Sequence, residues 1–178
     1  MRTDIIRIEQ NGNGFETALE ETRKAAEVWS GLGPNDALRL QLITEEMLCL
    51  VRSVTGEIEA GFWIEAEDRK YTMHLLTKTS MDKEKRYQLI SSSTSRRNEA
   101  AKGFLGKLRD IIEQALAAEV VHDYTEIPYE LVNDAPGFHP DDEEWDGYER
   151  SILRRIVDDI KISIRGGEVE MTVLKSFA

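Results

Sequence analysis

The clearest pattern in the chain is the helical spacing of apolar residues between Gly33 and Gly56. The apolar positions follow each other at alternating intervals of three and four: Leu40, Ile43, Met47, Leu50 and Val54, with Leu42 and Val51 widening the stripe. Such spacing places these side chains on one face of an α-helix. Pro34 suits a first helical turn, and Gly56 suits a left-handed C-terminal cap. We therefore predict a core helix over residues 34–55.

A short strand and another helix are predicted before this core helix. Isoleucines at positions 5, 6 and 8 indicate the strand, which ends at the turn-forming run Asn11-Gly12-Asn13-Gly14. From Phe15 to Trp29, apolar and charged residues recur with helical spacing. Because only Gly31-Leu32-Gly33 separates the two helices, we expect them to lie antiparallel.

Two hairpins are predicted from alternation with a period of two. Apolar and polar residues alternate over 58–66 and 71–79 around the polar turn 67–70, and over 160–165 and 168–175 around Gly166-Gly167. Strict alternation is typical of strands with one buried face, and a Gly-Gly pair is a strong signal for a two-residue hairpin turn.

Further helices are predicted over 82–90, from Asn98 to Leu116 and from Gly147 to Val157, with an irregular acidic segment at about 121–146. The order of elements predicts an α+β fold, a two-layer α/β sandwich whose mostly antiparallel sheet is covered on one face by helices. The length of 178 residues, 40% of them hydrophobic, favours one domain over 1–178.

Charge and composition narrow the classes of function. The formal net charge of −11 disfavours nucleic acid as a partner. No apolar run is long enough to span a bilayer and the first residues lack a signal-peptide core, so we expect a cytoplasmic protein without a membrane partner. The single cysteine, Cys49, is interpreted as a packed side chain. His74 is interpreted as a surface or packed histidine, because no second residue has zinc-ligand spacing to it.

Two segments carry a resemblance to a known family. Residues 31–50, from Gly31-Leu32-Gly33 along the core helix as far as Leu50, look like the N box and its approach in the GHKL ATP-binding fold of histidine-kinase catalytic domains and anti-sigma-factor serine kinases. Residues 147–162 look like that family's final helix and the strand after it. The similarity covers most of the chain outside residues 80–146, and it implies a histidine-kinase-ATPase-like sandwich.

The resemblance implies particular roles for two residues of the core helix. In the family, the N box pairs a glutamate that can act as a general base with an asparagine, four residues later, that helps to hold magnesium. Here Glu46 matches the glutamate, which implies a catalytic base, while Leu50 occupies the position of the metal ligand. Magnesium requires oxygen ligands, so a leucine cannot replace that asparagine.

The nucleotide contacts that the resemblance implies are spread over residues 82–106. Asp82 approximates the family's adenine-binding aspartate, without the glycines that follow it there, and Gly103 and Gly106 form a remote version of its glycine-rich lid. The stretch 91–97 is interpreted first as a flexible serine-rich loop. Its alternative role is an anion cradle in which Ser92, Ser93 and Arg96 contact phosphate at a helix start.

Three functions follow as hypotheses. We favour a regulatory binding module on a degenerate GHKL scaffold, without a cofactor, whose partner is a protein such as a sigma factor or its antagonist. The alternative is an active serine or histidine kinase-like protein that binds ATP with magnesium through atypical phosphate contacts. An α/β domain with a different ligand also stays open, because fold does not fix function. The sequence leaves a homodimer open as well.

Overall fold

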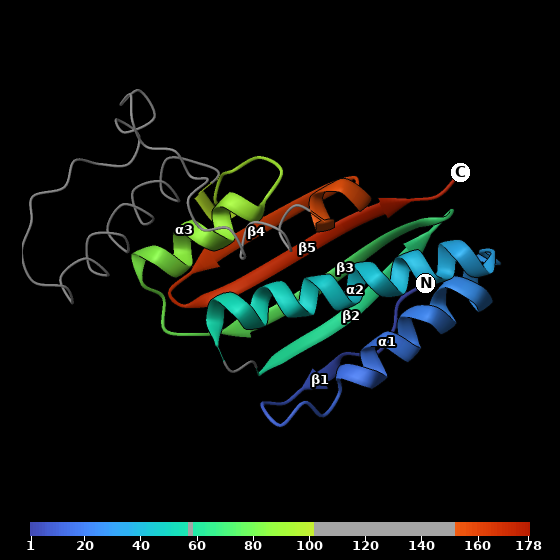
Figure 1. Ribbon diagram of the computed structural model, residues 1–178, viewed down its shortest axis with the longest axis horizontal. Coiled ribbons are helices and arrows are strands. Elements are labelled where there is room, and N and C mark those ends of the chain that lie inside the picture. The colour runs from blue at the N-terminus through green and yellow to red at the C-terminus, as the bar shows by residue number, and fades with distance from the viewer. Residues whose placement is uncertain (57–58, 102–151) are drawn as a thin grey trace, which may run out of the picture.

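The chain forms a five-stranded antiparallel sheet with helices on one of its faces (Figure 1). The computed structural model describes residues 1–56, 59–101 and 152–178. The strands lie in the order β1-β2-β3-β5-β4, and every neighbouring pair is antiparallel. Their bounds are β1 Ile6–Ile8, β2 Ala60–Glu67, β3 Lys70–Lys78, β4 Asp159–Arg165 and β5 Glu168–Ser176. The predicted α+β sandwich and both predicted hairpins are confirmed.

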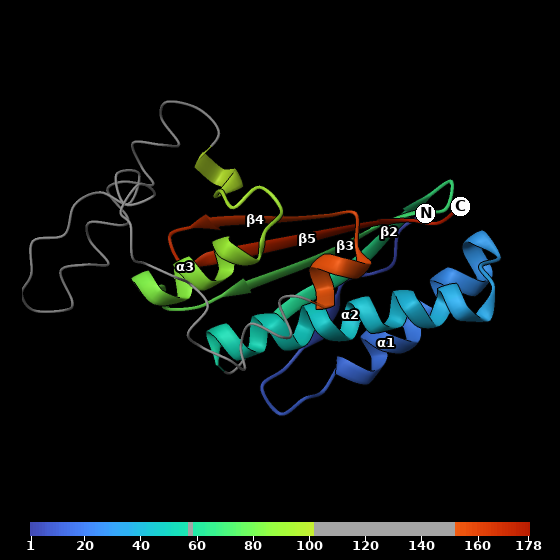
Figure 2. The ribbon, with the colours of Figure 1, turned by 45° about the horizontal axis from the view of Figure 1, so that its top comes forward.

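The helical layer is built around α2 (Pro34–Thr55), which coincides with the predicted core helix. Helix α1 (Phe15–Lys24) continues into a π-helical segment, η1 (Ala25–Trp29), and packs against α2. Figure 2 shows α1, α2 and the short helix at 152–156 on the same side of the sheet. Helix α3 (Lys83–Ser92) and the 3-10 turn η2 (Glu99–Ala101) follow β3. Most of the helices predicted from Asn98 and Gly147, and the acidic segment at 121–146, lie outside the described residues.

The core lies between α2 and the inner face of the sheet. Leu40, Ile43, Met47 and Val51 of α2 are completely buried. They belong to one cluster with the inward-facing strand residues Phe62, Ile64, Met73, Leu75, Ile162, Met171 and Val173. Fully burying each such side chain stabilises the fold by about 1.5–3 kcal/mol. Leu42 was expected to widen this stripe, and that expectation is wrong. It is 40% exposed, because two residues turn a helix by about 200° and direct Leu42 away from the side of Leu40.

Glycines allow the chain to turn sharply at two places. Gly166 and Gly167 have φ angles of 52° and 81°, in the left-handed region that a tight hairpin turn requires. Gly14, the residue before α1, has φ 86°, and a Cβ atom at this position would lie 2.0 Å from the carbonyl oxygen of Arg7. The turn between β1 and α1 is therefore closed by a contact that only glycine allows.

The outer edge of β4 is covered by the segment that follows α3. The N–H of Thr94 donates to the carbonyl oxygen of Ile160 (2.9 Å), and the N–H of Ile160 donates to Thr94 Oγ1 (2.8 Å). The Asn98 side chain likewise donates to the carbonyl oxygen of Ile164 (3.0 Å) and accepts from its N–H (2.9 Å). Part of the predicted serine-rich loop thus supplies hydrogen bonds to an edge strand.

Among the described residues, no helix has an apolar stretch long enough to cross a membrane.

Candidate functional site

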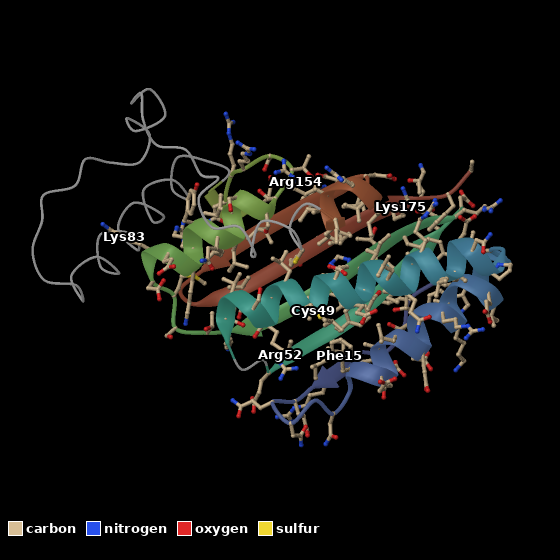
Figure 3. All side chains as sticks on the ribbon, viewed as in Figure 1. Phe15, Cys49, Arg52, Lys83, Arg154 and Lys175 are labelled. Carbon is tan, nitrogen blue, oxygen red and sulfur yellow. The ribbon has the colours of Figure 1, made fainter. Side chains whose placement is uncertain are left out.

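Glu46, which matches the N box glutamate, and Leu50, which replaces its asparagine, lie one turn apart on α2. Glu46 is half-buried, whereas Leu50 is only 2% exposed and belongs to the hydrophobic core. The position at which the resemblance expects a metal-binding amide is therefore occupied by a side chain that packs the fold. Cys49, predicted to be a packed side chain, is half-buried on the same helix (Figure 3).

The polar residues expected to contact a nucleotide lie at opposite ends of α3. Asp82 is the N-cap of this helix and accepts a hydrogen bond from the backbone N–H of Lys85 (2.8 Å). Ser92 and Ser93 lie at the other end, about 15 Å away for a helix of ten residues. The structure does not bring the aspartate and the serines together.

Both serine hydroxyl groups at the end of α3 are already bonded within that helix. Ser92 is 1% exposed and donates to the carbonyl oxygen of Leu89 (2.6 Å), and Ser93 donates to that of Ile90 (2.8 Å). A hydroxyl has one proton to donate, so in this arrangement neither serine offers a proton to an anion. Arg96 is exposed in a left-handed conformation (φ 51°). Gly103 and Gly106 lie outside the described residues.

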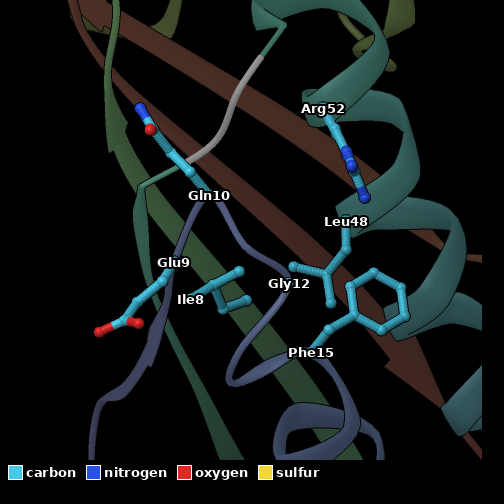
Figure 4. A pocket seen from close by; sticks show the side chains of 7 residues that line it. All are labelled: Ile8, Glu9, Gln10, Gly12, Phe15, Leu48 and Arg52. Carbon is cyan, nitrogen blue, oxygen red and sulfur yellow. The ribbon is translucent and has the colours of Figure 1, made fainter.

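A shallow pocket opens between the β1–α1 turn and α2 (Figure 4). Ile8, Phe15 and Leu48 give it an apolar floor, and Arg52 and Glu9 add charged groups. Leu48 and Leu50 are two residues apart on α2, so the pocket lies on the opposite side of the helix from Leu50. Asp82, Ser92, Ser93 and Arg96, the described residues that are expected to bind a nucleotide, do not line it.

The face of the sheet opposite the helices carries a polar cluster that the sequence did not reveal. We call it the open face; it consists of the odd-numbered residues of β2 and β4 and the even-numbered residues of β3 and β5. At its centre the rings of Trp63 and His74 stack with centroids 4.7 Å apart and planes 4° apart. The guanidinium carbon of Arg2 lies 5.2 Å from the centroid of the Trp63 ring, a cation–π arrangement.

Two carboxylates flank the imidazole of His74. Glu65 Oε2 lies 3.9 Å from Nε2, and Glu170 Oε1 lies 3.8 Å from Nδ1. Burial lowers the pKa of His74 below its ordinary value, and the two carboxylates offset this only in part. Trp63 Nε1 and His74 Nε2 are both buried, and neither has a hydrogen-bond partner among the described residues. The centre of the open face therefore holds a histidine whose neutral form is favoured and two nitrogen atoms with unused hydrogen-bonding capacity.

The sequence contained a signal for this pairing. Alternation predicted that Trp63 and His74 lie on the outer sides of consecutive strands, and the tight turn after Glu67 pairs that residue with Lys70. Counting back from this turn pairs Trp63 with His74. Within the described part of the chain, no group of three histidine, cysteine or acidic side chains is arranged to hold a metal ion.

A scan against protein-family models and a search of curated proteins found no match to this chain. The resemblance to the GHKL fold therefore rests on the order of the elements and on residues 31–50 and 147–162.

Proposed function

We propose that this chain is a regulatory binding module on a degenerate GHKL-like scaffold and that it recognises a protein partner. The burial of Leu50 is the observation that carries this proposal. With 2% of its surface exposed, this side chain contributes to the core at the position where an ATP-binding relative needs a magnesium ligand.

The loss of that ligand weighs against phosphate transfer. Phosphoryl transfer depends on cations that hold and neutralise the phosphate groups, and magnesium accepts only oxygen ligands here. A base such as Glu46 accelerates the reaction only when the substrate hydroxyl and the phosphate are already positioned. A leucine at position 50 instead gives the core the stabilisation of a buried aliphatic side chain.

The helical layer offers a feature that suits a protein partner. Leu38 and Leu42 lie one turn apart on the outer side of α2 and are 64% and 40% exposed. Apolar residues spaced by four positions are the usual anchors when a helix docks into a groove of another protein. A sigma factor or its antagonist is the partner class that the resemblance suggests.

The proposal is tested by affinity capture with the full chain as bait and the Leu38→Glu, Leu42→Glu double variant as the matched control. We expect the wild type to retain a sigma factor or an antagonist of one, and the purified partner to bind at least tenfold more weakly to the variant, the effect of about 1.4 kcal/mol of lost contacts. Equal binding of the purified partner to both forms would contradict the assignment of this surface.

The kinase alternative has a different readout. If the chain transfers phosphate from ATP to the captured partner, and Glu46→Gln abolishes that transfer, the protein is an enzyme and our proposal is wrong. Absence of transfer by the wild type and by the variant agrees with a binding module.

A further inference from the structure

One row of charges at the end of the open face alternates in sign across four strands. Lys78 of β3 pairs in register with Glu168 of β5, which pairs with Arg165 of β4. Glu59 directly precedes Ala60, the partner of Thr77, and so lies beside Lys78. All four residues are exposed. The row therefore reads negative, positive, negative, positive from β2 to β4.

This order of charges is complementary to itself under a two-fold rotation. Consider an axis parallel to the strands, between β3 and β5, with a second copy of the sheet facing the first. The rotation places Arg165 of one copy over Glu59 of the other, and Lys78 over Glu168. Each charge meets its opposite, as an isologous interface requires.

The same rotation also sets the central rows of the two copies opposite each other. Trp63, His74, Thr172 and Lys161 lie side by side across the four strands. The axis brings Lys161 over the outward edge of the Trp63 ring, whose faces contact His74 and Arg2, and Thr172 over His74. The neighbouring row consists of Glu65, Thr72, Leu174 and Asp159. There the rotation sets Glu65 of one copy opposite Asp159 of the other.

Each of these two carboxylates, Glu65 and Asp159, already has a cation beside it within its own copy. Arg2 Nε lies 3.7 Å from Glu65, and Lys161 Nζ lies 3.6 Å from Asp159. Each carboxylate therefore brings its own cation to the contact, which reduces the repulsion between them.

The overlapping area of the two open faces is near the lower limit for a specific dimer. The rotation superposes four strands, β2, β3, β5 and β4. With a spacing of about 4.8 Å and a length of about 28 Å, they give about 540 Å² per copy, or about 1,100 Å² over two copies, near the lower limit of specific interfaces. No described helix covers this face (Figure 2).

From the alternating row and the area of the face, we propose that the open face is the interface of a homodimer. Two sheets pack against each other about a two-fold axis parallel to their strands. This inference does not depend on the proposed function, which uses the opposite, helical layer.

The test measures the mass and the dimer dissociation constant of the full chain by sedimentation. The wild type should sediment at twice the chain mass of 20.3 kDa. Arg165→Glu places like charges at both symmetric contacts and should raise the dissociation constant about tenfold; Glu59→Arg should do the same. The double variant Glu59→Arg, Arg165→Glu exchanges the two charges and should restore the wild-type value. Arg39→Glu, on the exposed surface of α2, is the matched control and should leave the dissociation constant unchanged.

Two results would overturn the proposal. One is a wild-type chain that stays monomeric at about 100 μM, well above the dissociation constants of specific interfaces of this size. The other is a dimer whose dissociation constant is insensitive to the single reversals or is not restored by the exchange. Circular dichroism of each variant ensures that only folded proteins are compared, and these exposed positions should tolerate the changes.

Discussion

At the scale of single residues, Leu50 and Glu46 bear on the choice between the two hypotheses for this chain, a binding module and a kinase-like enzyme. Under the proposed GHKL resemblance, Glu46 would be the general base, and it is half-buried. Under the same resemblance, Leu50 would stand where magnesium needs an oxygen ligand, and it is a core residue. The role of Leu50 in folding can be measured separately from any nucleotide.

Leu50→Ala should lower the free energy of unfolding by about 3 kcal/mol, because it removes buried methyl groups and leaves a cavity. Leu38→Ala makes the same change on the same helix at a site that is 64% exposed, and it should change stability by less than about 0.5 kcal/mol. Denaturant unfolding measures both. Similar effects at the two positions would contradict the assignment of Leu50 to the core.

His74 should make stability depend on pH. Burial lowers its pKa in the folded state, so the unfolded chain binds the proton more readily. The contribution of neutral His74 is complete above the unfolded pKa of about 6.5 and is lost as the pH falls from there toward the folded pKa.

The measurement compares the unfolding free energies of the wild type and of His74→Phe at pH 7.5 and pH 5.5. Phenylalanine keeps a ring against Trp63 but cannot titrate. The wild type should lose more stability on acidification than the variant. Equal losses would show that protonation of His74 does not oppose folding.

At the scale of elements, the sequence predicted what depends on local periodicity. The stripe on α2 and the alternation around Gly166-Gly167 each identified an element, because burial on one face imposes a period of 3.6 or 2. The stacking of Trp63 on His74 was not predicted, because counting from the turn gives only which residues are paired and not how their rings are oriented. The use of Thr94 and Asn98 to cover β4 was not predicted either, since it joins segments more than sixty residues apart.

The turn before α1 gives a test at this scale. Gly14→Ala should destabilise the fold by more than Gly12→Ala, although both glycines have φ angles near 87°. Alanine at Gly12 suffers only the left-handed conformation, about 1–2 kcal/mol, because no atom of the described residues lies within 4 Å of the added Cβ. Alanine at Gly14 also collides with the Arg7 carbonyl. Equal changes in thermal stability would contradict this close approach.

The edge of β4 gives a second test. Asn98→Ala leaves the N–H and the carbonyl oxygen of Ile164 without their side-chain partner in a buried position, which should cost about 1–3 kcal/mol. Ser95→Ala, in the same segment, removes an exposed hydrogen bond to Glu99 and should have little effect. Faster amide exchange of Ile164 only in the Asn98 variant would support this role, and unchanged exchange would count against it.

At the scale of the whole molecule, the two faces of the fold have separate assignments. The helical layer carries Leu50 inside and the exposed pair Leu38 and Leu42 outside, and it is the proposed surface for a protein partner. The open face carries the self-complementary row of charges and is the proposed dimer interface. Partner binding should therefore survive substitutions that break the dimer.

The central claim is that this chain does not bind a nucleotide through a magnesium ion. Calorimetric titration of the full chain with ATP, in the presence and in the absence of magnesium, tests it most directly. We predict no saturable heat that depends on magnesium, because Leu50 supplies no oxygen ligand. Tight binding of ATP that requires magnesium, and that is lost in Glu46→Gln, would contradict the account.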